Sequence, residues 1–245
     1  MKVIAYSALA YGVEYLRWAI RSVINCVDEY HVLYAAQGSY GHRTTEPCPD
    51  SRDDLLRIAQ EAAGSKLFWH DGDWHGEGQH RSTINQVAPH ADIIVSLDYD
   101  EIWQPGLVHQ AIEIAKHGNV RRWRVPIIHY WRSFNRCVLH DPAFPERVYN
   151  THFEDGSEYL STTLKINHMG YAIRPELARW KWLIHGHKNE LRRDVDWFRD
   201  VYVANRQTDT HPVGSEYWWP ETVNPWDYLP EWMRLHPYAN MELIE

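Results

Sequence analysis

The first half of the chain alternates short apolar runs with amphipathic segments, and this alternation limits its fold more than any other feature. Strand-like runs stand at residues 2–6, 30–36, 66–69 and 92–97. Segments with helical periodicity or helix-end signals stand between and after them, at 14–24, 51–64, 81–87 and 105–117. Such a pattern predicts an α/β fold with a mostly parallel sheet flanked by helices.

The pattern becomes less regular after Gly118. Residues 123–130 (WRVPIIHY) resemble a strand in which Pro126 indicates an edge or a bulge, and 147–149 and 164–167 are shorter strand candidates. Helices are expected from Pro175 and over 190–204. The sequence therefore predicts a domain over 1–204, with halves 1–118 and 119–204. Residues 205–245 are expected to form a C-terminal extension, helical and extended, that packs on this domain.

Composition narrows the functional classes. Hydrophobic residues make up 44% of the 245 residues, but no apolar run approaches the roughly 20 residues that span a bilayer. The N-terminus lacks the layout of a signal peptide, so a cytoplasmic location is expected. Three cysteines without CxxC spacing indicate neither a disulfide framework nor a cysteine-zinc site. The net charge of −8 disfavours nucleic acid as a partner.

An acidic cluster directly follows the apolar run 93–97. Asp98 and Asp100 are alternate residues of an extended segment, so both carboxylates can face one ligand. In open α/β sheets, ligands bind outside the carboxyl ends of the strands. Two carboxylates there suit Mg²⁺ or Mn²⁺, which would take further ligands from substrate phosphates and water. The cluster predicts a diphosphate site; a solvated loop whose acids cap the next helix is the alternative.

These elements and several motifs resemble glycosyltransferase family 2 and its GT-A relatives. Residues 3–36 resemble the family's first strand, helix and second strand, and LDYDEIWQPG (97–106) resembles its metal motif. WHGEGQHRSTIN (74–85) is similar to a segment that closes over the nucleotide. HMGYAIRPELARWK (168–181) is similar to a segment that follows the acceptor region. The resemblance covers roughly residues 1–190.

The resemblance implies a GT-A (Rossmann-like) fold and a metal-dependent glycosyltransferase. The enzyme would move a sugar from a nucleotide-diphosphate sugar, with UDP favoured, to a saccharide or other hydroxyl acceptor, with inversion. It implies Mn²⁺ or Mg²⁺ as cofactor, held by Asp98, Asp100 and His168. The implied donor-binding residues are Ala5, Tyr6, Ser7, Glu77, Arg81, Asp98 and Lys181. The family's base-binding motif after the second strand reads AAQGSYGHRT here, which leaves the base open.

Two further roles have competing candidates. Inverting transfer needs a general base near the acceptor hydroxyl, usually a carboxylate. In related enzymes an acid shortly precedes an Arg-hydrophobic-aromatic triplet, here residues 147–149, which favours Asp141 or Glu146. His187 competes with His168 as the third metal ligand.

Three other readings of the sequence remain open. His70, His75 and His80, or His185 with His187, allow a zinc site, although a spacing of five does not match a helical pair. Arg121, Arg122 and Arg124 allow a phage-type transferase that acts on a modified DNA base. Thirteen tryptophans, with Trp218 and Trp219 adjacent in the tail, allow a non-catalytic sugar-binding module. Such modules are usually β-sandwiches, which the alternation disfavours.

Overall fold

The structure is a computed structural model that describes residues 1–38, 42–141, 144–186, 195–204 and 220–244. The strands of the larger sheet are β1 (Val3–Leu9), β2 (Glu29–Ala35), β3 (Leu67–Gly72), β4 (Ile93–Ser96), β6 (Arg122–Arg124), β9 (Glu146–Asn150) and β10 (Ser157–Tyr159). Those of the smaller sheet are β5 (Glu101–Trp103), β7 (Ile127–Trp131), β8 (Arg136–Val138), β11 (Ile166–Tyr171) and β12 (Glu221–Thr222). The helices are α1 (Leu16–Val23), α2 (Arg52–Ala63), α3 (Glu77–Ser82), α4 (Ile84–Val87), α5 (Leu107–His117) and α6 (Pro175–Ile184).

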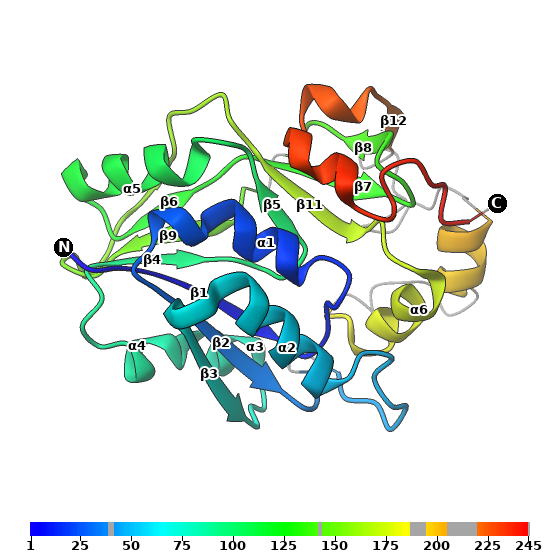
Figure 1. Ribbon diagram of the computed structural model, residues 1–245, viewed down its shortest axis with the longest axis horizontal. Helices are drawn as coiled ribbons and strands as arrows, with labels where there is room; N and C mark the ends of the chain where they lie inside the picture. Colours follow the sequence, from blue (N-terminus) through cyan, green and yellow to red (C-terminus); the bar gives the residue numbers. More distant parts are fainter. Residues whose placement is uncertain (39–41, 142–143, 187–194, 205–219, 245) are drawn as a thin grey trace.

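The larger sheet has the order β10-β6-β9-β4-β1-β2-β3 (Figure 1). Strands β3, β2, β1 and β4 run parallel, and β9 lies antiparallel between β4 and β6. Every residue of β1 and β4 is buried, because helices cover both faces of the sheet. The predicted α/β fold with a mostly parallel sheet flanked by helices is therefore confirmed.

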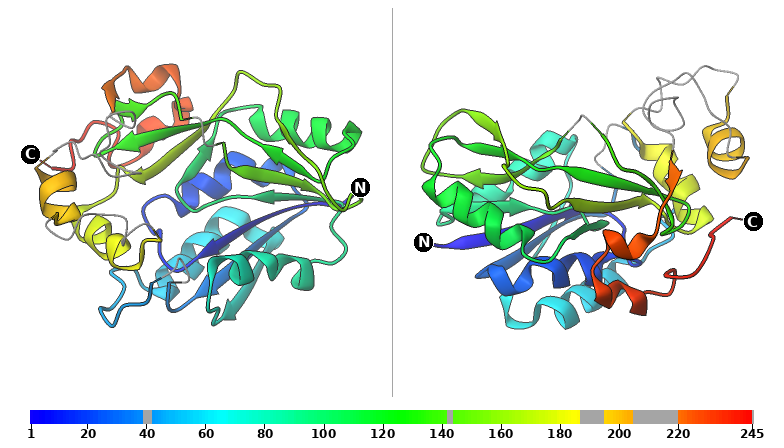
Figure 2. Two further views of the ribbon diagram at one scale, coloured as in Figure 1. Left: turned by 180° about the vertical axis from the view of Figure 1, so that it is seen from behind. Right: turned by 90° about the horizontal axis from the view of Figure 1, so that it is seen from above.

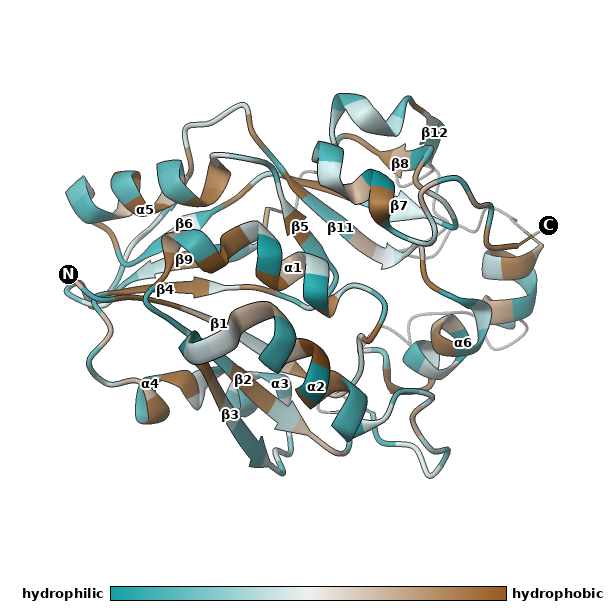
Figure 3. Ribbon diagram, viewed as in Figure 1, coloured by the Kyte–Doolittle hydropathy of each residue, from teal (hydrophilic) through white to brown (hydrophobic). Residues whose placement is uncertain are grey.

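The two faces of this sheet carry different helices. Alternate residues of β1 point to opposite faces. Ala5 packs into a core shared with α1, α2 and α5, whereas Ile4 and Tyr6 pack with Ile84 of α4 on the other face. Figure 2 shows the molecule from behind, with α3 and α4 on the side opposite α1 and α2. Helices α1 and α2 alternate polar and apolar residues (Figure 3), as expected of helices that cover one face.

Local signals place the helix ends where the sequence predicts them. Helix α2 begins after Ser51, whose hydroxyl accepts a hydrogen bond from the Asp54 N–H at 3.1 Å. It ends before Gly64, whose φ of +56° is a conformation that favours glycine. Helix α5 likewise ends before Gly118.

The expected strand over 123–130 is two strands that belong to different sheets. Strand β6 ends at Arg124 and β7 begins at Ile127, with Pro126 in the break. Proline has no N–H to donate to a ladder, so the chain changes sheets at this point. The expected helix over 81–87 is also two pieces, α3 and α4, and begins earlier, at Glu77.

Strand β5 was not expected, because it lies inside the acidic motif. It pairs antiparallel with β11, and the register sets Glu101 opposite His168. Strand β11 also pairs with β7 in parallel, which sets His168 beside His129. The smaller sheet, of order β12-β8-β7-β11-β5, thereby carries the acidic motif to the later histidines.

Residues 220–244 lie along the smaller sheet near α1 (orange to red in Figure 2). The Trp232 ring stacks on Trp18 with centroids 5.9 Å apart, and the Tyr228 carbonyl accepts hydrogen bonds from Gln104 and Asn167. Of the helix expected over 190–204, the described part holds a π-helical turn, Trp197–Val203. The domain boundary at residue 204 stays a prediction.

The described ranges contain no helix that is both long enough and apolar enough to cross a bilayer.

His236 anchors the C-terminal segment and is expected to make stability depend on pH. Its Nε2 donates to the Glu14 carbonyl at 3.0 Å, and its Nδ1 accepts from the Tyr238 N–H at 3.0 Å. Burial lowers the pKa of His236 from 6.5 to about 4. The unfolded chain therefore binds a proton more readily, and stability falls as pH falls from 6.5 toward 4. At pH 5 the loss from this residue is about 2 kcal/mol.

Urea unfolding at pH 7.5 and pH 5.0 measures this loss. His236→Asn is expected to lose about 2 kcal/mol less than the wild type between the two pH values. His117→Asn, which replaces an exposed histidine of α5, should behave as the wild type does. An equal pH-dependent loss in wild type and His236→Asn would contradict the assignment.

Candidate active site

A pocket of about 210 Å³ lies beyond the carboxyl ends of β1 and β4. Its lining comes from the β1–α1 loop, α3, the turn after β4, β11, and α6 with the residues that follow it. The lining residues are Tyr11, Glu77, Asp98, Tyr99, Asp100, His168, Lys181, Ile184, His185 and Gly186. Segments far apart in the sequence thus meet at the edge of the sheet where ligands bind in open α/β folds.

Asp100 is the most deeply buried acid of this pocket, at 2% exposure. The Lys181 Nζ lies 3.3 Å from its Oδ2 and donates a hydrogen bond to the Gly170 carbonyl at 2.9 Å. The His168 Nε2 lies 3.6 Å from the Asp100 Oδ1. Burial alone would raise the pKa of Asp100, but the charges of Lys181 and His168 hold it well below its usual range. The pocket therefore contains a permanent anion at neutral pH.

Gly170 allows this close grouping. A Cβ on Gly170 would lie 2.4 Å from the His168 Cε1 and 3.1 Å from the Lys181 Nζ. Any larger residue would push both side chains away from Asp100. Gly12 does the same for Tyr99: its φ is +129°, and a Cβ there would lie 2.1 Å from the Tyr99 ring. These two glycines set how tightly the acidic turn packs.

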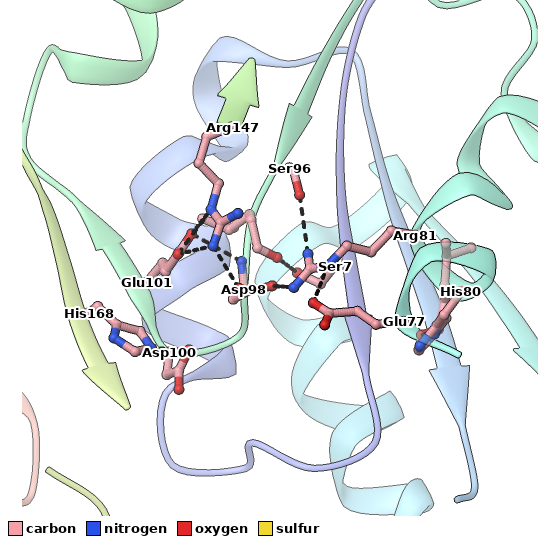
Figure 4. Close-up of polar contacts among 12 residues, drawn as sticks. Ser7, Glu77, His80, Arg81, Ser96, Asp98, Asp100, Glu101, Arg147 and His168 are labelled. Atoms are coloured by element: carbon pink, nitrogen blue, oxygen red, sulfur yellow. Dashed lines mark hydrogen bonds and ion pairs between the residues drawn. The ribbon is translucent and has the colours of Figure 1, made fainter. Parts of the chain in front are cut away.

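Asp98 is held between two guanidinium groups (Figure 4). Arg81 Nη2 donates to its Oδ1 at 2.8 Å, and Arg147 Nη2 donates to its Oδ2 at 2.8 Å. Burial alone would raise the pKa of Asp98. The two arginines together lower it by more, so the pKa of Asp98 lies below its usual value. Both oxygens already have cationic partners. The geometry therefore does not present Asp98 to a metal ion, although the sequence predicted it as a ligand.

Glu101 and Arg147 form a pair that sequence reasoning did not assign. Glu101 is 0% exposed, and Arg147 donates to its two carboxylate oxygens from Nε at 2.9 and 3.0 Å and from Nη2 at 2.6 Å. Burial raises the pKa of Glu101 even though Arg147 opposes this shift. A signal was available: a third acid, Glu101, directly follows the D-Y-D motif, and an arginine opens the triplet 147–149.

His129 was also not identified as a site residue from the sequence. Its Nδ1 lies 2.8 Å from the His168 Nδ1, and its Nε2 lies 2.8 Å from the Asp141 Oδ2. Burial lowers the pKa of His129 to about 4, so the imidazole is neutral at pH 7. Asp141, predicted as a general base, is thus linked to Asp100 through two histidines and does not line the pocket. Its role as base stays a prediction.

Several predicted donor-binding residues lie elsewhere. Ala5 and Ser7 are fully buried, and the Ser7 hydroxyl donates to the Leu97 carbonyl at 2.6 Å, so neither side chain is offered to a ligand. Tyr6 and Glu146 line a separate cavity of about 510 Å³ on the α3–α4 face. Glu146, the other candidate base, is therefore away from Asp100.

Glu77 remains at the pocket, and Arg81 lies beside it. The Arg81 Nε donates to the Glu77 Oε1 at 2.8 Å, while its other end holds Asp98. Glu77 lines the pocket directly, and Arg81 also borders the cavity on the α3–α4 face. Arg81 thus lies between the pocket and this cavity, and its guanidinium group contacts both Glu77 and Asp98.

The remaining acid and histidine suit a divalent cation. Within the described ranges, no group of three or more His, Cys, Asp and Glu side chains is arranged to hold a metal. Asp100 Oδ1 and His168 Nε2 are 3.6 Å apart. Adjacent ligands of an octahedral ion with bonds of about 2.1 Å lie about 3 Å apart, so a small approach of the two side chains lets both contact one ion. These two groups therefore fit a cation that takes its other ligands from phosphates and water.

The rival sites gain no support from the described residues. His70 contacts His31 at 3.1 Å, and the buried His80 contacts the Leu33 carbonyl at 2.8 Å. The basic cluster is engaged locally: Arg121 Nη1 donates to the Phe153 carbonyl at 3.0 Å, and Arg122 Nη2 to Asp155 at 2.7 Å. Other candidates lie outside the described residues, namely His187, Trp218 and Trp219.

Comparison with known proteins gives limited similarity. No protein-family model and no curated protein matches the chain. Among solved structures, S. aureus TarS 1–349 has 12% identity and a TM-score of 0.47, over 80% of this chain and 67% of that chain. The same fragment in complex with UDP-GlcNAc has 13% identity and a TM-score of 0.47, over 80% and 68%. For S. aureus TarS the values are 13% and 0.43, and the match spans 41% of that chain.

The buried pair predicts a large stability effect. Arg147→Met leaves the Glu101 carboxylate buried without its cation, and such a loss costs about 3–5 kcal/mol. Arg122→Met removes an arginine whose partner Asp155 is exposed, so it should cost less than about 1 kcal/mol. Urea unfolding at pH 7.5 measures both. A similar small cost for the two variants would show that Arg147 does not hold the acidic turn.

Proposed function

We propose that this protein is a glycosyltransferase that uses a nucleotide-diphosphate sugar. The observation that carries the proposal is the pocket beyond β1 and β4, in which the ionised Asp100 meets His168 and Lys181. A permanent anion beside a cationic side chain suits a ligand that brings both a divalent cation and negative phosphates. The sequence resemblance to family 2 enzymes supports the same assignment.

Asp100 and His168 would hold the cation, Mn²⁺ or Mg²⁺. Such an ion neutralises the charge that develops on a diphosphate leaving group as its bond to the sugar breaks. Lys181 supplies a second positive charge from α6 and is only 13% exposed, which strengthens its interaction with a phosphate. The protein's own part is to keep Asp100 ionised and to hold these groups in fixed positions.

The acidic turn and α3 would bind the nucleoside side of the donor. Asp98 is fixed by Arg81 and Arg147, so its backbone and carboxylate are presented rigidly. Glu77 lines the same pocket and is fixed by Arg81. We favour UDP as the nucleotide and a saccharide or other hydroxyl compound as the acceptor, with inversion at the transferred sugar. The acceptor proton would pass to a carboxylate, for which Asp141 and Glu146 are the sequence-based candidates.

A donor screen tests the proposal. A ligand that binds the native state raises its melting temperature, so UDP-sugars, GDP-sugars and dTDP-sugars are compared with and without Mn²⁺ or Mg²⁺. We expect a shift with a UDP-sugar that needs the cation. Asp100→Asn should abolish the cation-dependent shift, whereas Asp53→Asn, an exposed acid of α2, should retain it. The proposal fails if no nucleotide-sugar shifts the wild type or is hydrolysed or transferred by it.

Lys181→Met tests the second cation of the pocket. A hydrogen bond to a charged group contributes about 1.5–3 kcal/mol, so we expect UDP to bind about 10- to 100-fold more weakly. Lys116→Met, which removes a lysine paired with Glu113 on α5, is the matched control and should bind as the wild type does. Calorimetric titration with UDP and excess Mg²⁺ gives the dissociation constants. Unchanged affinity in Lys181→Met would remove this residue from the donor site.

A further inference from the structure

A line of three side chains leads from the interior of the protein to the pocket. The Asp141 Oδ2 lies 2.8 Å from the His129 Nε2, and the His129 Nδ1 lies 2.8 Å from the His168 Nδ1. The far nitrogen of His168, Nε2, faces the Asp100 Oδ1 at 3.6 Å. Asp141 and His129 are only 12% and 14% exposed, so water competes little for these contacts.

The sheet register fixes this line. Strands β7 and β11 are neighbours in parallel pairing, and His129 stands beside His168 in their register. The two rings meet edge to face, with centroids 4.9 Å apart and planes at 89°. Asp141 follows strand β8, which pairs antiparallel with β7. The His129–His168 contact therefore follows from backbone pairing, and Asp141 reaches His129 from the segment that follows β8.

For a neutral His168, the form that can bind a cation, the donor and acceptor roles along the line have one consistent solution. An ionised carboxylate only accepts hydrogen bonds, so the His129 Nε2, which lies 2.8 Å from one, must be the nitrogen that carries the hydrogen. A neutral imidazole has a single N–H, so the His129 Nδ1 accepts. The His168 Nδ1 must then be the donor, which leaves the His168 Nε2 as a bare lone pair directed at the pocket. A lone pair at this atom is what a cation beside Asp100 requires.

We propose that Asp141 and His129 are positioning residues that fix the tautomer and orientation of His168 for cation binding. Outer hydrogen-bonding partners of this kind orient a ligating histidine and increase its basicity. The inference rests on the proposed function, because it needs a cation at Asp100 and His168. It gives Asp141 a role different from that of general base.

The tautomer is measured first, in the metal-free protein with ¹⁵N-labelled histidines. Long-range ¹H–¹⁵N correlation spectra are expected to show the wild-type His168 with its hydrogen on Nδ1. In Asp141→Asn the amide can donate to the His129 Nε2, which moves the His129 hydrogen to Nδ1 and the His168 hydrogen to Nε2. We therefore expect the variant to lose the single Nδ1–H form of His168. A wild-type His168 with its hydrogen on Nε2 would overturn the inference.

Affinity for Mn²⁺ alone is measured next by calorimetry. Loss of such a partner typically weakens metal binding 10- to 100-fold, and we expect this range for Asp141→Asn. Glu113→Gln is the matched control: it alters a carboxylate near His117 on α5, outside the pocket, and should bind Mn²⁺ as the wild type does. His129→Phe keeps a planar aromatic ring but removes the acceptor of His168. It provides an independent test if Asp141→Asn does not fold.

The outcomes separate this inference from the proposed function. Weaker Mn²⁺ binding together with an altered His168 tautomer supports the positioning role. Wild-type affinity and tautomer in Asp141→Asn, with turnover alone reduced, would make Asp141 the base and overturn the inference while the glycosyltransferase proposal stands. A wild type that binds neither Mn²⁺ nor Mg²⁺ would overturn the proposed cation and this role of Asp141 together.

Discussion

The contact of the Arg147 guanidinium with Glu101 and Asp98 is the interaction on which the rest of the site depends. Glu101 is fully buried, and a buried carboxylate without a partner costs several kcal/mol. Arg147 comes from β9, the antiparallel strand beside β4, so the pair joins the two ends of the acidic turn to the larger sheet. The turn that follows β4 is thereby held in one conformation.

The fixed turn connects a strand of the larger sheet to a strand of the smaller one. Residues 93–96 are the last parallel strand beside β1, and residues 101–103 are the edge strand of the smaller sheet. Asp98 and Asp100 lie in the four-residue connection between them. Because β5 pairs with β11, the connection is brought against His168, and through β7 against His129. The pocket lies where the two sheets meet, which explains why its residues come from distant parts of the sequence.

The two aspartates have different charged partners, which distinguishes their roles. Asp98 has an arginine on each oxygen and is a structural anion that orients the turn. Asp100 has one lysine and one histidine, both from the β11–α6 segment, and it faces the pocket. Arg147 also pairs with Glu101, so the partners of Asp98 are tied to a second buried acid.

The sequence by itself determined the α/β alternation, the cap and end of α2, and the position of the acidic turn at the end of a buried strand, because these depend on periodicity and on neighbouring residues. Its motifs, through the family resemblance, also suggested His168 as a metal ligand with Asp100 and Lys181 as a donor-binding residue, and the structure sets both side chains beside Asp100. The sequence did not separate the roles of Asp98 and Asp100. Nor did it identify β5, the change of sheet at Pro126, the Glu101–Arg147 pair or His129.

Only the tertiary structure decided these points, because each depends on which strands become neighbours. Asp98 differs from Asp100 because β9 lies beside β4 and brings Arg147 to one carboxylate and not the other. His129 reaches His168 because β7 and β11 pair in parallel with these two residues opposite each other. Periodicity specifies which residues are buried, but the pairing of distant strands specifies which charges meet.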